Sequence, residues 1–211
     1  MMHASIVAIA RTAVAAALLP VILFLNGCSF GPPPREAAVS YDLGPQIIPA
    51  PVSSASRLTL LVPEASAPAW LDGSGIVYRL NYADPARPQV YAQSRWVDSP
   101  AALLTQRIRA RFAAVGPVAN GRDGARADYA LQVEIEDFSQ IFDGADSSKV
   151  SVRLRVTLVN LAGRSLQAQR SFSASQPSEP DAKGAVRAFA RTTDVLLEDI
   201  LEWTKSSLKG S

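Results

Sequence analysis

The chain has 211 residues, with 21 basic and 19 acidic side chains and a formal net charge of +2. This near balance excludes the broad positive field with which proteins attract nucleic acid, and we expect no nucleic-acid partner. A single cysteine excludes an internal disulfide framework, and the length suits one folded domain.

The chain begins with a predicted lipoprotein signal peptide over residues 1–27. Its apolar run, residues 12–25, is shorter than the about 20 residues of a membrane-spanning helix and is typical of a secretory leader. The run ends in Leu25-Asn26-Gly27-Cys28, which resembles a bacterial lipobox with Asn26 in place of the more usual Ala or Ser. This resemblance implies that the leader is cut away and that Cys28 becomes a diacylated N-terminus.

Lipidation at Cys28 would restrict both the location and the chemistry of the protein. The next residue is Ser29 rather than the Asp that retains many lipoproteins in the inner membrane, so the resemblance favours an anchor in the outer membrane, facing the periplasm. Cleavage also removes His3, the only histidine, and leaves no free thiol. Because acid–base and nucleophilic catalysis depend largely on such groups, we expect a protein that is not an enzyme.

Residues 28–56 are predicted to be the lipidated N-terminus and an extended tether, because they are rich in proline and poor in apolar side chains. Within this segment, Val39–Leu43 alternates apolar and polar residues, which predicts a first strand docked on the domain. A single α+β domain is expected over residues 57–207.

Three strands and a helix are predicted in the first half of this domain. The strands are expected over residues 57–62, 75–80 and 89–96. Ser99 caps the helix, Pro100 occupies its first position, and Gly116-Pro117 ends it. Its apolar face carries Leu104, Ile108 and Phe112. Residues 118–127 are expected to form a loop.

Two alternating segments, Tyr129–Phe138 and Lys149–Asn160, predict an antiparallel hairpin around a loop at residues 143–146. One register satisfies both faces, with apolar pairs inside and opposite charges outside. The pairs expected in this register are Ile135 with Leu154, Val133 with Val156, Glu136 with Arg153 and Glu134 with Arg155. A slip of one residue would bury arginines, whereas a slip of two residues would keep both faces.

A further strand and a second helix complete the predicted domain. The strand, residues 165–174, is expected to turn Leu166, Ala168 and Phe172 inward, and residues 176–180 form a loop. The helix covers residues 181–205, with an apolar stripe of Val186, Phe189, Thr193, Leu196, Ile200 and Trp203. The prediction is an α+β fold in which two amphipathic helices pack against a largely antiparallel sheet, in the order strands, helix, strands, helix.

Glu134 and Glu136 are the carboxylates best placed for catalysis. Two residues apart on a strand, they would share a face about 7 Å apart, which loosely resembles the pair of a glycosidase. Their alternation with core residues and their pairing with Arg153 and Arg155 favour a solvated ladder of charges instead.

The remaining polar and aromatic groups are predicted to be structural. Arg107 and Arg111 share a helix face from which Arg109 turns away, so a solvated surface is favoured over a contact with anionic lipid. Asp143 and Asp146 lack the alternating carboxylates of a calcium loop, and no metal or cofactor is expected. Three tryptophans are expected to anchor the core or an interface rather than stack on sugars: Trp70, Trp96 and Trp203.

Taken together, these residues resemble the auxiliary lipoproteins of ABC-type intermembrane transport systems of the paraquat-inducible type. The similar segments are packing and pairing signatures rather than catalytic motifs. Beyond the lipobox they include Tyr41-Asp42-Leu43, residues 67–79, Arg95-Trp96, residues 133–138 and residues 142–144.

The resemblance implies a non-catalytic docking component in a pathway that moves phospholipids or other hydrophobic molecules across the periplasm. Its partners would be an MCE-domain protein and an inner-membrane permease with its ATPase. A phospholipid held by the domain itself and a homo-oligomer are both compatible with this function. Two alternatives remain: an assembly lipoprotein that binds another outer-membrane protein, and an envelope hydrolase that uses Glu134 and Glu136.

Overall fold

The structure is a computed structural model that describes residues 37–46, 58–122 and 124–209. The chain from Ala37 onward forms one compact unit. The predicted signal peptide, Cys28 and most of the predicted tether lie outside the described residues. No helix within the described residues is both long enough and apolar enough to cross a membrane.

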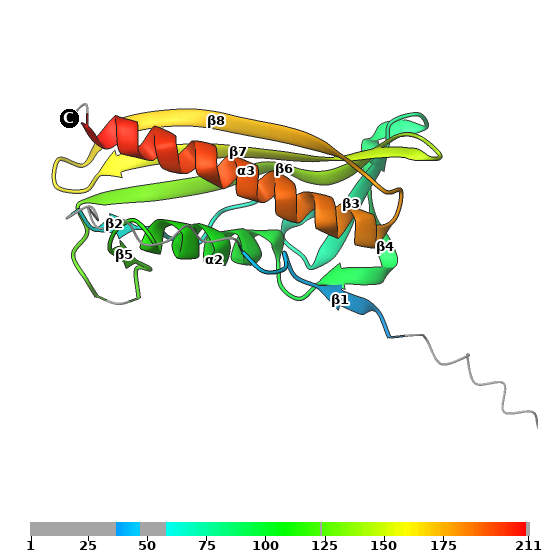
Figure 1. Cartoon of the computed structure of the whole chain (residues 1–211), viewed down its shortest axis with the longest axis horizontal. Helices are drawn as coiled ribbons and strands as arrows, with labels where there is room; N and C mark the ends of the chain where they lie inside the picture. Colours follow the sequence, from blue (N-terminus) through cyan, green and yellow to red (C-terminus); the bar gives the residue numbers. More distant parts are fainter. Residues whose placement is uncertain (1–36, 47–57, 123, 210–211) are drawn as a thin grey trace, which may run out of the picture. The chain divides into compact units, whose positions relative to one another are not determined.

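Eight strands and two α-helices make up the part of the chain that the structure describes (Figure 1). The strands are β1 (Val39–Tyr41), β2 (Leu60–Leu61), β3 (Gly75–Leu80), β4 (Asp84–Trp96), β5 (Val118–Ala119), β6 (Tyr129–Gly144), β7 (Ser147–Asn160) and β8 (Ser165–Ser178). The helices are α2 (Pro100–Ala113) and α3 (Ala182–Lys209), with a short 3-10 helix, η1, at Ala69–Leu71. The predicted α+β class and element order are confirmed.

Strand β6 organises the sheet because both of its edges are paired. One edge forms an antiparallel ladder with β7, which pairs in turn with β8. The other edge is shared by two parallel partners, with β2 beside its first residues and β3 beside its last. Strand β3 pairs antiparallel with β4. Strand β4 also pairs in parallel with β1, with Val39–Tyr41 beside Ser94–Trp96. The sheet is therefore mixed but mostly antiparallel.

The predicted β6–β7 hairpin is confirmed in its faces and in three of its four expected pairs. Ile135 lies opposite Leu154, Val133 opposite Val156, and Glu134 opposite Arg155. The expected pair of Glu136 with Arg153 is wrong, because a bulge at Glu136 places Asp137 opposite Arg153. Because of this extra residue the side chain of Phe138 points into the core, where it is buried.

Several predicted boundaries differ from those in the structure. The expected strand 57–62 is only two residues long as β2, and the expected loop 118–127 contains the short strand β5, which pairs with β2. Strand β8 continues through most of the expected loop 176–180. A bulge in β8 beside Leu158 and Val159 turns Leu166 to the outer face, where 64% of it is exposed, whereas Phe172 points inward as predicted.

The two helices cover the apolar face of the sheet, and α3 lies along β7 and β8 (Figure 1). Helix α2 starts as predicted, with the backbone N–H of Ala102 donating to Ser99 Oγ at 3.2 Å. The predicted stripe of α3 is buried at Phe189, Thr193, Leu196 and Ile200. The ring of Phe189 stacks on Phe138 of β6 at 4.3 Å between centroids, which joins helix and sheet at the centre of the core.

Helix α3 begins at a close backbone approach that only glycine allows. The backbone N–H of Gly184 donates to Asp181 Oδ1, which caps the helix. A Cβ atom built on Gly184 would lie 2.5 Å from Glu179 Cβ and 2.9 Å from the Glu179 carbonyl oxygen. The chain that leaves β8 therefore crosses directly against the first turn of α3.

We predict that Gly184→Ala lowers the free energy of unfolding by about 1–3 kcal/mol, because the added methyl group overlaps the backbone of Glu179. The overlap outweighs the higher helix propensity of alanine, which is worth about 1 kcal/mol. Urea unfolding followed by tryptophan fluorescence measures the change. Gly73→Ala is the control, since its methyl group meets no atom within 4 Å. Equal unfolding midpoints for the two variants would contradict the steric explanation.

Candidate functional site

The two carboxylates considered for catalysis lie on the outer face of β6 and share one arginine. Arg155 Nη1 lies 3.4 Å from Glu134 Oε2, and Arg155 Nη2 contacts Glu136 Oε1. Half of the Glu134 side chain is exposed. The pair therefore forms part of a charge ladder, as predicted, with Arg155 in place of Arg153 as the partner of Glu136. The shared arginine on the outer face of the sheet supports a structural role for the two carboxylates over that of a hydrolase pair.

Within the described parts of the chain, Asp143 and Tyr91 have pKa values that clearly depart from their ordinary ones. A hydrogen bond from Lys149 Nζ to Asp143 Oδ2, at 2.6 Å, holds the pKa of this exposed carboxyl below its usual range. Burial raises the pKa of Tyr91, and the charge of Asp181 adds to the rise. The Tyr91 hydroxyl donates to Gln140 Oε1 at 2.7 Å.

Gln140 is a fully buried polar residue that ties strands together near the end of the β6–β7 hairpin. Its Nε2 donates to Ser148 Oγ, Ser178 Oγ and the carbonyl of Glu179 at 2.9–3.1 Å. With Tyr91, these bonds connect β4, β6, β7 and β8. The network is satisfied internally, so it explains the junction of the strands and leaves no free group for catalysis. No cluster of three or more metal-ligating side chains occurs within the described residues.

The prediction that Arg107, Arg109 and Arg111 form a solvated surface is wrong. Arg107 and Arg111 are only 5% and 6% exposed, and each contacts an acidic residue of α3. Arg109 donates from Nε and Nη2 to the carbonyl oxygen of Val62 at 2.9 and 2.8 Å. All three arginines therefore join α2 to other parts of the domain.

Arg107 makes the most extensive of these contacts. Its Nε and Nη2 donate to the two carboxylate oxygens of Asp194 at 2.9 and 2.8 Å, in a bidentate pair. Its Nη1 donates to the carbonyls of Leu43 and Gly44 at 3.1 and 3.0 Å. The side chain of Gln46 donates a hydrogen bond from Nε2 to the Arg107 carbonyl oxygen at 2.8 Å. We call this set of contacts the Arg107 clamp.

The clamp fixes both the N-terminal segment and the relative direction of the helices. Arg111 Nη1 pairs with Glu198 Oε2 at 2.9 Å, one turn beyond the pair of Arg107 with Asp194. Since both residue numbers increase by four, α2 and α3 run in the same direction. Their carboxyl ends consequently lie at the same end of the domain.

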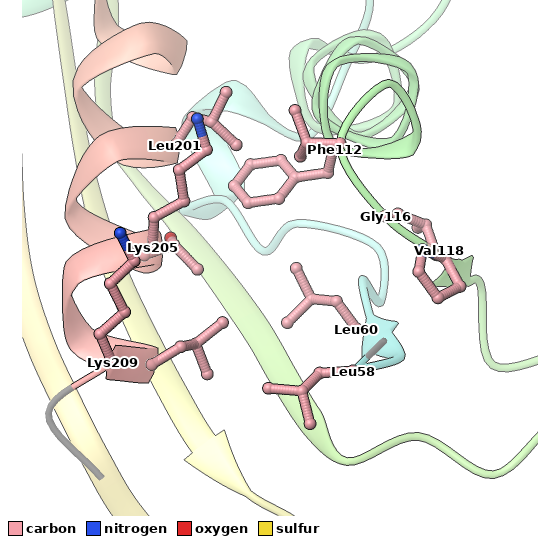
Figure 2. Close-up of a pocket in the computed structure, with 12 residues that line it drawn as sticks. Leu58, Leu60, Phe112, Gly116, Val118, Leu201, Lys205 and Lys209 are labelled. Atoms are coloured by element: carbon pink, nitrogen blue, oxygen red, sulfur yellow. The ribbon is translucent and has the colours of Figure 1, made fainter. Parts of the chain in front are cut away.

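An apolar pocket of about 490 Å³ lies between these two carboxyl ends (Figure 2). Leu58 and Leu60 form one side together with the chain that follows α2, and the last turns of α3 form the other. Figure 2 shows Leu58, Leu60 and Phe112 facing α3 across the pocket. The residues that line it are Leu58, Leu60, Phe112, Val115, Gly116, Pro117, Val118, Leu201, Thr204, Lys205, Leu208 and Lys209.

The three tryptophans lie apart from this pocket's lining, and each packs against the core. Trp96 is 1% exposed and meets Phe138 and Phe189 edge-on. Trp203 is half-buried and lies edge-on to Phe172. Trp70 is also half-buried and carries the guanidinium of Arg79 over its ring at 4.8 Å. The expectation of anchoring tryptophans is confirmed, with Trp96 at the centre of the core.

Comparison with known families identifies the fold. The model of the family described as "ABC-type transport auxiliary lipoprotein component" matches residues 41–201. This chain belongs to that family. The predicted family resemblance is thereby confirmed, and the match includes α2, the β6–β7 hairpin and most of α3.

Solved structures share the fold of this auxiliary lipoprotein. A Xanthomonas campestris protein of the family DUF330 superposes with a TM-score of 0.73 at 22% identity, covering 82% of this chain and 98% of that chain. An uncharacterized protein gives a TM-score of 0.63 at 19% identity, with coverages of 80% and 99%. A hypothetical protein from Chlamydia trachomatis gives 0.50 at 10% identity, covering 74% and 100%. No curated protein matches the chain.

Sequence reasoning missed the partners of the arginines in this auxiliary lipoprotein. Asp194 and Glu198 stand four residues apart on α3, as Arg107 and Arg111 do on α2. The matched spacing was a usable signal, because two parallel helices can bring such pairs into register. The pocket had no comparable signal, since its apolar residues come from separate segments without a common period.

We predict that Arg107→Ala lowers the free energy of unfolding by about 3 kcal/mol, because Asp194 and the carbonyls of the N-terminal segment lose their shared donor. Urea unfolding measures this loss. Arg155→Ala is the matched control, since it removes an exposed arginine with two acidic partners and should cost less than about 1 kcal/mol. Arg107→Lys should restore only part of the loss, because lysine cannot form the bidentate pair. A loss no greater than that of Arg155→Ala would refute the clamp.

Proposed function

We propose that this auxiliary lipoprotein is the outer-membrane-anchored docking component of an ABC-type system that moves phospholipids or related hydrophobic molecules between membranes. The family match over residues 41–201 carries this proposal. Cys28 is the proposed site of lipid attachment, because it is the only cysteine and ends an apolar leader. Ser29 supports placement at the outer membrane, where the domain faces the periplasm.

The proposed role is non-catalytic. Glu134 and Glu136 share Arg155 on an exposed face, and the polar cluster around Gln140 is internally satisfied. The lone histidine, His3, belongs to the predicted leader. Transport energy would come from an ATPase at the inner membrane, and an MCE-domain protein would connect that complex to the lipoprotein. The domain then contributes a binding surface and a fixed attachment to the membrane.

The anchor is tested by replacing Cys28 while the chain is secreted with a leader that a general signal peptidase cuts. Cys28→Ala should abolish incorporation of radiolabelled palmitate, move the protein from the membrane to the soluble periplasmic fraction, and stop transport. Membrane fractionation and circular dichroism measure location and folding. Ser29→Asp is the companion variant, since it keeps the lipid and should shift the protein to the inner membrane. Full transport by the soluble Cys28→Ala protein would contradict the anchoring role.

The partner is tested by mild crosslinking in cells, followed by purification of the tagged full chain and mass spectrometry. We expect an MCE-domain protein and its permease and ATPase to be enriched over a sample of an unrelated outer-membrane lipoprotein. Repeated recovery of an outer-membrane assembly protein in their place would favour the alternative function of an assembly lipoprotein and would overturn the proposed one.

A further inference from the structure

We propose that the pocket between the carboxyl ends of α2 and α3 binds one acyl chain of a phospholipid, with the anionic headgroup at Lys205 and Lys209. This inference rests on the proposed function, since a lipid-transport component is the setting in which a periplasmic domain meets such a ligand. The proposed function requires only docking. The pocket would add a direct contact between this domain and the transported lipid.

The lining of the pocket matches a hydrocarbon chain. Leucine, valine, proline and phenylalanine side chains form most of it, and Phe112 and Leu201 are almost fully buried at 4% and 2% exposure. Its volume of about 490 Å³ lies within the range of about 300–1,000 Å³ that is typical of small-molecule sites. Leu58 is 39% exposed, so an apolar surface continues from the buried wall to solvent. A ligand that is apolar along its length therefore fits this pocket.

The charges beside the pocket match an anionic headgroup. Lys205 and Lys209 are four residues apart on α3 and therefore share a helix face. They are the charged members of the lining, which contains no acidic residue among the described residues. Glu202 lies outside the lining and contacts Lys205 Nζ at 2.7 Å. Two cations next to an apolar cavity favour an amphiphile with a negative head over a neutral or cationic one.

Photo-crosslinking in cells tests the contact with the full-length protein. Leu58 is replaced by p-benzoyl-phenylalanine, because its position at the exposed side of the pocket tolerates a larger side chain. Val195 of α3 and Leu166 of β8 receive the same replacement as controls, since they are 49% and 64% exposed and lie away from the pocket lining. Cells are grown with radioactive phosphate or with radioactive palmitate and then irradiated. The purified protein is stripped of lipid that is not covalently attached and cut with a protease, and the label on the fragment that contains Leu58 is measured.

The proposal predicts a phosphate-labelled adduct at Leu58 that is at least about tenfold stronger than at Val195 or Leu166. Equal labelling at the three positions would mean general proximity to the membrane and would overturn it. Palmitate label without phosphate label, on a Leu58 fragment that is free of Cys28, would identify a free fatty acid as the occupant, which also overturns it. So would an adduct confined to another segment of the same chain, or no adduct at all.

The lysines are tested in the same Leu58 background. Lys205→Glu with Lys209→Glu should reduce the phosphate-labelled adduct by about fivefold or more, the size expected for two exposed charge contacts. Lys205→Arg with Lys209→Arg should retain it, and Lys183→Glu, in the first turn of α3, should leave it unchanged. If the two lysines serve only to offset the negative carboxyl end of α3, the double Glu variant will unfold at lower urea with an unchanged adduct. That outcome would refute the headgroup contact.

The same strains separate this inference from the proposed function. The Leu58 protein with its native lysines and the double Glu variant are both purified after crosslinking and examined for the MCE-domain protein and the transporter. If the protein with its native lysines recovers these partners normally but forms no lipid adduct, the pocket is refuted and the docking role is kept. A lipid adduct without the transport partners would refute the docking role and keep the pocket.

Discussion

The buried guanidinium of Arg107 is the constraint on which the arrangement of the helices and the N-terminal segment depends. A charged group that is 5% exposed is stable only when its donors are nearly all used, and Arg107 uses them on Asp194 and on backbone carbonyls of residues 43–45. This contact and the pair of Arg111 with Glu198 align α2 with α3, so the carboxyl ends of the two helices meet. The apolar pocket exists at that meeting point.

The long elements of the fold could be predicted because one physical rule decided each of them. Strict alternation determined the faces of β6 and β7, and the stripe of α3 determined which side of this helix is buried. The bulge at Glu136 escaped prediction, although two polar residues in succession before Phe138 are its trace in the sequence. Strand β2 was predicted too long and β5 was missed, because the extent of two-residue strands depends on neighbours distant in the sequence.

The candidate site was harder to predict than the fold. The arginines of α2 were expected in solvent because charged residues are mostly exposed, and a single helix does not reveal that Asp194 stands opposite Arg107. The pocket depends on the same tertiary alignment, so it appears in the structure and not in any local pattern. The charge ladder of Glu134 and Glu136 on the outer face was predicted correctly, because the residues on the outer face of a hairpin follow from the register of its inner face.

The order in which the N-terminal segment is attached has a mechanical consequence. Tension entering the domain through Ala37 acts first on the three paired residues of β1, and next on the backbone carbonyls that Arg107 holds. These attachments lie away from the pocket, which belongs to the β2–β5 end of the sheet (Figure 1). A pull on the N-terminal side is thus resisted before it reaches the carboxyl ends of the helices. The load therefore falls on β1 and on the Arg107 clamp, which stand between the N-terminal segment and the pocket.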